Sequence, residues 1–411
     1  MPRKFLELIT PTRIYVGAKG SALFLSFGFS IIYSRLLGLE NRSVLTFIFT
    51  GSSLLILGFI SSLGLSLRKS ISKSENIDLD IQQYLRNLIL LTLLLSGIYA
   101  SILTFYSNFV AALNPKLFGL SLVLFCTSSI IQGFNELLIG LDRFRTIGLL
   151  ENLEILMQVI LFSIFYGAIE LSIIVSVIFS MTLTYISSSI VVWKLARKQI
   201  SLKLSHLLRK NRNYTGELKI FDSGSLTTTL PLVLFDRLDK VMIGIVLPLA
   251  SLSQYAVLLV FFSLVRFIPE SVSKTFFSQS QRMHRYSQKK LRLSASITFL
   301  VLLSSYPLYL LSTNFLLGID WVLPLNIFVA TAAFEFARAT YLLRINRHFS
   351  KDLGATFSLI HVWWFIGFSC LLILISTHFM GLIGAPLSML VTYGCILMYG
   401  EIVAKRSGSE K

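Results

Sequence analysis

The sequence predicts an all-helical protein that crosses a membrane many times. Of its 411 residues, 54% are hydrophobic and only 14% are charged, and the mean hydropathy is +0.75. Soluble domains usually carry about 25% charged residues. The apolar residues form repeated blocks of about 20, the length that lets a helix cross ~30 Å of hydrocarbon, rather than the short alternating strands of a membrane barrel. The expected fold class is therefore all-α and polytopic.

The apolar blocks predict twelve spans, and polar residues or glycines separate most of them. The expected spans are residues 15–37, 44–67, 87–108, 117–139, 149–168, 171–193, 220–247, 253–277, 293–312, 322–343, 355–377 and 381–402. The first span follows a basic start but no small-residue cleavage site comes after it, so we expect it to be a retained anchor.

The basic residues predict the orientation, because short cytoplasmic loops are enriched in Lys and Arg. With both termini inside, only Arg42 and Lys116 fall in outer loops, whereas every inner segment carries at least a pair of basic residues. This distribution accounts for the net charge of +17 without a basic nucleic-acid surface, so no nucleic-acid partner is expected. Both termini are therefore expected to be cytoplasmic.

The longest inner loop predicts two lobes. Residues 1–193 form an N-terminal lobe of six spans, residues 194–219 a basic cytoplasmic linker, and residues 220–411 a C-terminal lobe of six spans. Phe134–Arg145 (FNELLIGLDRFR) and Phe334–Arg347 (FEFARATYLLRINR) echo each other, since each has an early glutamate and a basic inner end. We expect the lobes to be related by a pseudo-two-fold axis along the membrane normal.

Charged residues within the spans are the candidate site, because each costs about 3 kcal/mol to insert without a partner. In the seventh span, Asp222, Asp236 and Lys240 fall within about 60° on one helix face, flanked by Arg237 and Asp239. The sequence predicts that this face points into a polar cavity or toward a neighbouring lobe. The other candidates in the spans are Lys19, Arg266, Glu270, Glu335 and Arg338.

Local ion pairing is the alternative interpretation of these charges. Asp236 with Lys240, Arg266 with Glu270, and Glu335 with Arg338 are spaced as neighbours on one helix, so each pair can neutralise itself. Both interpretations stay open. Lys19 has no opposite charge within one turn of its own helix, so we expect it to meet a partner on another helix or an anionic ligand.

The remaining reactive residue types point to no cofactor. Cys126, Cys370 and Cys395 lie within spans and lack metal-type spacing, and the five histidines are scattered singly. Outer loops are short, which leaves no room for a large soluble catalytic domain. We therefore expect no metal, no cofactor and no enzymatic centre.

Three stretches resemble a known family of transporters. They are residues 31–67 (IIYSRLLGLENRSVLTFIFTGSSLLILGFISSLGLSL), 132–156 (QGFNELLIGLDRFRTIGLLENLEIL) and 230–265 (LPLVLFDRLDKVMIGIVLPLASLSQYAVLLVFFSLV). Their order and content are similar to those of polysaccharide-biosynthesis flippases, the Wzx-like transporters of O-antigen and capsule repeat units. These belong to the multidrug/oligosaccharidyl-lipid/polysaccharide exporter (MOP) superfamily. The outer turns at 40–43 and 253–255 depart from the family pattern.

The resemblance implies a flippase in the cytoplasmic membrane of a bacterium that moves a polyprenyl-diphosphate-linked oligosaccharide from the inner to the outer leaflet by alternating access. It implies that Lys19, Arg237, Lys240, Arg266 and Arg338 attract the diphosphate and sugars, and that Asp222, Asp236, Asp239, Glu270 and Glu335 balance charge or couple transport. A polysaccharide polymerase and chain-length proteins are the further partners expected. The fold expectation does not depend on this resemblance.

Two other functions remain open. A small-molecule or multidrug exporter of the same superfamily shares the twelve spans, but that class favours buried carboxylates over cations, and here the two are equally common. An O-antigen polymerase or ligase has a similar composition, but resembles a pattern with a large periplasmic loop that this sequence lacks.

Reporter fusions test the topology. Fusions at Lys116, at residues 248–252 and at 313–320 should report an outer location, and fusions within 197–215 a cytoplasmic one, because of the basic inner loops. A strong reversal at any of these positions contradicts the twelve-span arrangement with both ends inside.

Overall fold

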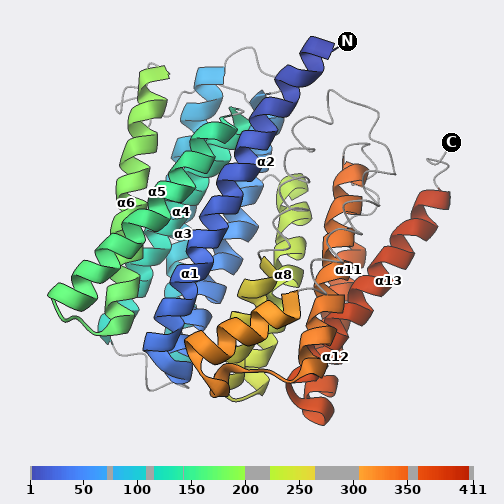
Figure 1. The fold of residues 1–411 in the computed structure, drawn as a ribbon. Helices are drawn as coiled ribbons and strands as arrows, with labels where there is room; N and C mark the ends of the chain where they lie inside the picture. Colours follow the sequence, from blue (N-terminus) through green and yellow to red (C-terminus); the bar gives the residue numbers. More distant parts are fainter. Residues whose placement is uncertain are drawn as a thin grey trace. The chain divides into compact units, whose positions relative to one another are not determined.

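A computed structural model describes residues 2–71, 77–107, 115–141, 143–199, 223–263, 305–349 and 360–406. Within these ranges every regular element is helical and no strand occurs (Figure 1). Six segments are long and apolar enough to cross a membrane, and a shorter apolar helix covers Leu249–Ser263. The predicted all-α, polytopic class is therefore confirmed in the described part of the chain.

The first two predicted spans form one helical run with a sharp joint. Helix α1 covers Pro2–Leu55, a π-helical turn covers Ile56–Ile60, and α2 covers Ser61–Ile71. The run is interrupted at Gly38, whose φ of 71° and ψ of 175° lie in a region that essentially only glycine adopts. The sequence predicts an outer loop at residues 38–43, but a single glycine joint takes its place.

The next four spans match the prediction with shifted ends. Helices α3 (Ile77–Ser107), α4 (Pro115–Gly140) and α6 (Ile173–Gln199) each extend beyond the expected apolar core. Helix α5 covers Phe144–Ser163 and continues through the π-helical turn Ile164–Ala168. The start of α3 lies further out than predicted because the helix includes the polar residues Asp78 and Asp80 in its first turn.

The second half is described in part. Helix α8 covers Ser223–Val246, and α11, α12 and α13 cover Leu325–Phe349, Ile360–Met380 and Gly384–Arg406. Before α11, residues 305–312 are helical and lead through the π-helical turn Thr313–Leu317 and the 3-10 turn Ile319–Trp321. A 3-10 turn, Gly381–Ile383, joins α12 to α13. Most of the predicted eighth and ninth spans lies outside the described residues.

The chain divides into two compact units. One unit contains Met1–Thr46 and Phe235–Lys411, and the other contains Phe47–Leu234. The boundaries predicted for the lobes and the linker at 194–219 stay a prediction, because residues 200–222 lie outside the described part.

Helix packing within each unit follows the same order. In the unit of residues 47–234, α6 packs against both α4 and α5; in the other unit, α13 packs against both α11 and α12. Thus the last predicted span of each half contacts the two spans before it, as expected for a duplicated six-helix pattern. Figure 1 shows α11, α12 and α13 together at the red end of the chain.

An aromatic core fills the unit that contains the candidate charges. The Phe27 ring of α1 meets the Phe261 ring edge-on at 4.7 Å, and Phe261 meets Tyr309 at 5.2 Å. The Tyr309 hydroxyl also accepts a hydrogen bond of 2.9 Å from the backbone N–H of Leu323. These contacts fix α1, the helix Leu249–Ser263 and the segment before α11 relative to one another.

A glycine substitution tests the joint in α1. Gly38→Ala should lower the unfolding temperature of the purified protein, because an alanine in this backbone region costs about 1–3 kcal/mol. Gly28→Ala is the matched control: Gly28 lies in regular helix with open space around its missing Cβ, and alanine should be neutral or slightly stabilising there. Equal effects of the two changes contradict the strained joint.

Candidate functional site

Helix α8 carries the densest group of charges in the described part of the chain. Asp236, Arg237, Asp239 and Lys240 follow one another within little more than one turn, so they spread over different helix faces. Asp239 is fully buried, while the side chains of Asp236 and Arg237 are 28% and 22% exposed. The cluster therefore has a buried end and an accessible end.

The buried end is held by a tyrosine from the next helix. The Tyr255 hydroxyl donates a 2.8 Å hydrogen bond to Oδ2 of Asp239, and both residues have no exposed surface. The other oxygen, Oδ1, accepts a 2.8 Å bond from the backbone N–H of Lys240. Hydrogen bonds to an ionised carboxylate are stronger than neutral ones, so this contact fixes α8 against Leu249–Ser263.

Arg338 of α11 bridges two carboxylates from different helices. Its Nη1 donates to Oε1 of Glu335 at 2.9 Å, and its Nη2 forms an ion pair with Oδ1 of Asp236 on α8. The side chains of Arg338 and Glu335 are only 3% and 2% exposed. The pair between Asp236 and Arg338 therefore links the predicted seventh and tenth spans directly.

The accessible end of the cluster is Arg237. Its Nε lies 3.7 Å from Oδ2 of Asp236, a distance too long for a hydrogen bond. Asp236 thus faces two guanidinium groups, one buried and one partly exposed. Of the two, Arg237 is the one that a ligand can approach.

Aromatic rings surround the ionic bridge. The Tyr393 ring of α13 lies 4.5 Å from Phe235, 5.7 Å from Phe334 and 5.4 Å from Tyr341. The guanidinium carbon of Arg338 lies 6.0 Å from the centre of the Phe334 ring. These rings exclude water from one side of the bridge, which strengthens its electrostatic attraction.

The structure places the predicted residues unevenly. Asp236, Arg237, Asp239, Lys240, Glu335 and Arg338 lie on α8 and α11, and the predicted local pair between Glu335 and Arg338 is confirmed. Lys19 lies half-buried on α1. Asp222, Arg266 and Glu270 lie outside the described residues. The substrate and coupling roles of all ten residues stay predictions.

Two features of the charge network were not predicted from sequence. The first is Tyr255: nothing in the sequence distinguishes it from other aromatic residues, but in the structure its hydroxyl donates a hydrogen bond to Asp239. The second is a partly buried ion pair in the other unit, between Arg68 of α2 and the buried Glu136 of α4. Gln132 donates a 3.2 Å bond to the same glutamate. The only sequence signal for this pair was that Glu136 and Glu335 occupy similar positions in the two stretches that resemble each other, residues 134–145 and 334–347.

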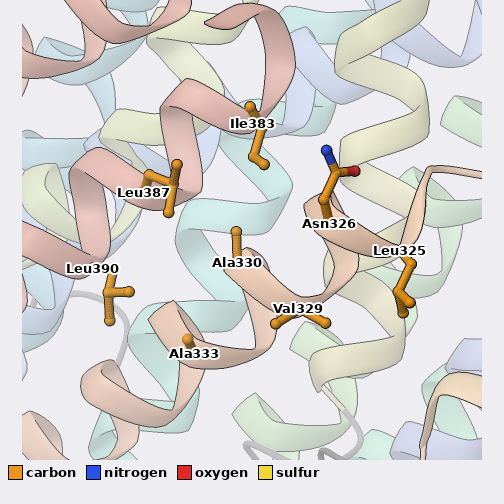
Figure 2. A pocket seen from close by; sticks show the side chains of 8 residues that line it. All are labelled: Leu325, Asn326, Val329, Ala330, Ala333, Ile383, Leu387 and Leu390. Atoms are coloured by element: carbon orange, nitrogen blue, oxygen red, sulfur yellow. The ribbon is translucent and has the colours of Figure 1, made fainter.

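A separate hollow lies between α11 and α13. It has a volume of about 660 Å³, and apart from the Asn326 amide only aliphatic side chains line it. Figure 2 shows Val329, Ala330 and Ala333 of α11 on one side and Leu387 and Leu390 of α13 on the other. It shares no residue with the charge cluster, and its lining suits hydrocarbon rather than a charged group.

The described residues hold no group of three His, Cys, Asp or Glu side chains close enough to bind a metal ion. The three cysteines are partly buried and form no disulfide. Chemically, the cluster on α8 and α11 offers guanidinium donors and carboxylate acceptors, and so suits binding of a charged, hydrogen-bonding ligand.

Comparisons with known proteins identify the fold. No family model matches the sequence. No curated protein matches it either. Solved structures do: the inward-facing and outward-facing forms of a multidrug resistance MATE family transporter of the MOP superfamily align with TM-scores of 0.64 and 0.61. The sequence identities are 14% and 13%, and the alignments cover 95% and 98% of this chain and 94% and 97% of those chains.

A third similar structure is a MOP superfamily transporter from Pyrococcus furiosus, whose binding pocket of reverse polarity suggests a different function. It aligns with a TM-score of 0.63 and 14% identity over 97% of this chain and 96% of that one. These matches show that the chain has the fold of the MATE transporters. The predicted fold class is confirmed.

Removal of one hydroxyl tests the buried end of the cluster. Tyr255→Phe should lower the free energy of unfolding by about 1–3 kcal/mol, because the Asp239 carboxylate loses a buried donor. The measurement is thermal unfolding of the purified protein in detergent.

Tyr341→Phe is the matched control. Tyr341 is also buried, but its hydroxyl has no hydrogen-bond partner among the described residues, so its removal should be neutral or stabilising. If both changes cost the same stability, the bond between Tyr255 and Asp239 does not carry the effect.

Proposed function

We propose that this chain is an alternating-access transporter of a bacterial cytoplasmic membrane that moves a polyprenyl-diphosphate-linked oligosaccharide to the outer leaflet. Its termini are cytoplasmic, and its partners are the lipid-linked oligosaccharide, a polysaccharide polymerase and chain-length proteins. The fold supports the transport mechanism, since proteins with this fold have been seen facing both inward and outward. The three stretches that resemble Wzx-like flippases support the substrate class.

The observation that carries the substrate class is the charge balance on α8 and α11. Within the cluster, three carboxylates, Asp236, Asp239 and Glu335, are matched by three cations, Arg237, Lys240 and Arg338, and α11 carries two further arginines toward its C-terminal end. A site for cationic drugs needs carboxylates whose charge is left for the drug, whereas here Arg338 already neutralises two of them. A partly exposed Arg237 suits an anion such as a diphosphate.

A small-molecule exporter is the second candidate, and the comparisons favour it more directly. The solved structures that align along nearly the whole chain include multidrug resistance transporters. The apolar hollow between α11 and α13 also suits a hydrophobic compound.

Deletion of the gene in its host separates the two candidates. The flippase proposal expects surface glycan to disappear and lipid-linked repeat units to accumulate on the cytoplasmic side, with unchanged resistance to cationic dyes. Unchanged surface glycan together with raised dye sensitivity contradicts the flippase and supports the small-molecule exporter.

Charge removal tests the site within the flippase proposal. Arg237→Ala and Lys19→Ala should each reduce surface glycan at least about tenfold, since a lost charge-assisted contact costs roughly 1.5–3 kcal/mol. Arg237→Lys should keep part of the activity, because it preserves the charge but loses the planar fork. The readout is surface glycan per unit of protein in the membrane.

Arg35→Ala is the matched control, because Arg35 lies exposed on α1 and should export glycan normally. If Arg237→Ala and Lys19→Ala both export glycan at the wild-type rate, the predicted diphosphate contacts are wrong. If both variants are absent from the membrane while Arg35→Ala is present, the two residues act in structure and not in binding.

A further inference from the structure

Arg338 lies between two carboxylates, those of Asp236 and Glu335, that would otherwise repel each other. Asp236 on α8 and Glu335 on α11 each pair with one of the two terminal nitrogens of the Arg338 guanidinium. Because the guanidinium is small, the two carboxylates are close to each other. Two ionised carboxylates this close repel each other strongly away from water unless a cation lies with them. Glu335 and Arg338 are almost fully buried, so bulk solvent screens this site poorly.

We propose that Arg338 is a built-in cation, occupying the position that a metal ion would otherwise have to fill between Asp236 and Glu335. The helices α8 and α11 then hold together without a bound ion. The proposal concerns the ion dependence of the folded protein and stands or falls independently of which substrate is transported.

An arginine suits this role better than a lysine. Its guanidinium presents donors in a rigid plane and can serve two carboxylates at once, as Nη1 and Nη2 do here. The Phe334 ring, 6.0 Å from the guanidinium carbon, and the neighbouring Tyr393 ring limit its movement. An arginine also stays charged throughout the physiological pH range, so the cation of the bridge is always present.

Removal of Arg338 should uncover a cation site. Arg338→Ala leaves two carboxylates beside the space vacated by the side chain. Carboxylate oxygens are the ligands that Ca²⁺ prefers, and Na⁺ is bound by the same kind of donor. The variant should therefore gain a dependence on cations that the wild type lacks.

The test is thermal unfolding of the purified, full-length protein in detergent. Solutions of choline chloride, NaCl, and choline chloride with millimolar CaCl₂ are compared at equal ionic strength. The wild type should unfold at the same temperature in all three. Arg338→Ala should unfold earlier in choline chloride and recover by at least about 3 °C with Ca²⁺ or Na⁺, the size expected for ligand well above its Kd.

Two control variants show whether both carboxylates are needed. The double variant Asp236→Asn with Arg338→Ala retains only Glu335 and should lose the response to cations. Arg68→Ala in the other unit leaves the single carboxylate of Glu136, so it should be destabilised without a cation response. A wild type stabilised specifically by Na⁺ or Ca²⁺, or an Arg338→Ala variant that no cation stabilises, overturns the proposal.

A charge-free variant keeps the test decisive if Arg338→Ala does not reach the membrane. Asp236→Asn, Glu335→Gln and Arg338→Met together remove every charge of the bridge, so no cation is needed, and such replacements are often tolerated. Recovery of the folded protein in this triple variant supports the built-in cation. If the triple variant is also lost, Arg338 is required for packing and the proposal is wrong.

Discussion

The ion bridge of Arg338 with Asp236 and Glu335 is the constraint on which the arrangement of α8 and α11 depends. A guanidinium that is 3% exposed in a span can be kept only where acceptors meet it, so the two helices must present their carboxylates at one point. The contact of Tyr255 with Asp239 then fixes the opposite side of α8. The aromatic rings of Phe235, Phe334 and Tyr393 pack beside this ionic centre.

The other unit meets the same requirement with different partners. Arg68 of α2 pairs with Glu136 of α4, and Gln132 supplies a further donor. In both units a buried glutamate lies on the fourth predicted span of its half, which fits the packing order that the two units share. Buried ion pairs often add little stability compared with apolar residues of the same size. Their presence in both units therefore suggests a role in helix placement or ion balance more than in net stability.

Hydropathy was sufficient to predict the fold class, because the length of each apolar block is a property of the chain itself. The sequence predicts a loop at residues 38–43, where the structure has only the joint at Gly38. A single residue in an unusual backbone conformation cannot be distinguished from a short loop by hydropathy. The pair of Glu335 with Arg338 was within reach because helical spacing makes neighbours predictable. The pair of Asp236 with Arg338 was not, because two residues about 100 positions apart meet only through tertiary packing, and the same holds for Tyr255 and Asp239.

Charge balance limits how this fold can use its cluster. Arg338 is committed to two carboxylates and buried, so it has little capacity left for a ligand unless the bridge opens. Arg237 is different: it is partly exposed, and its distance of 3.7 Å from Asp236 leaves the carboxylate only loosely engaged on that side. The two arginines of the cluster therefore differ in their surroundings: Arg338 is buried and joins α8 to α11, whereas Arg237 is the guanidinium that solvent partly reaches.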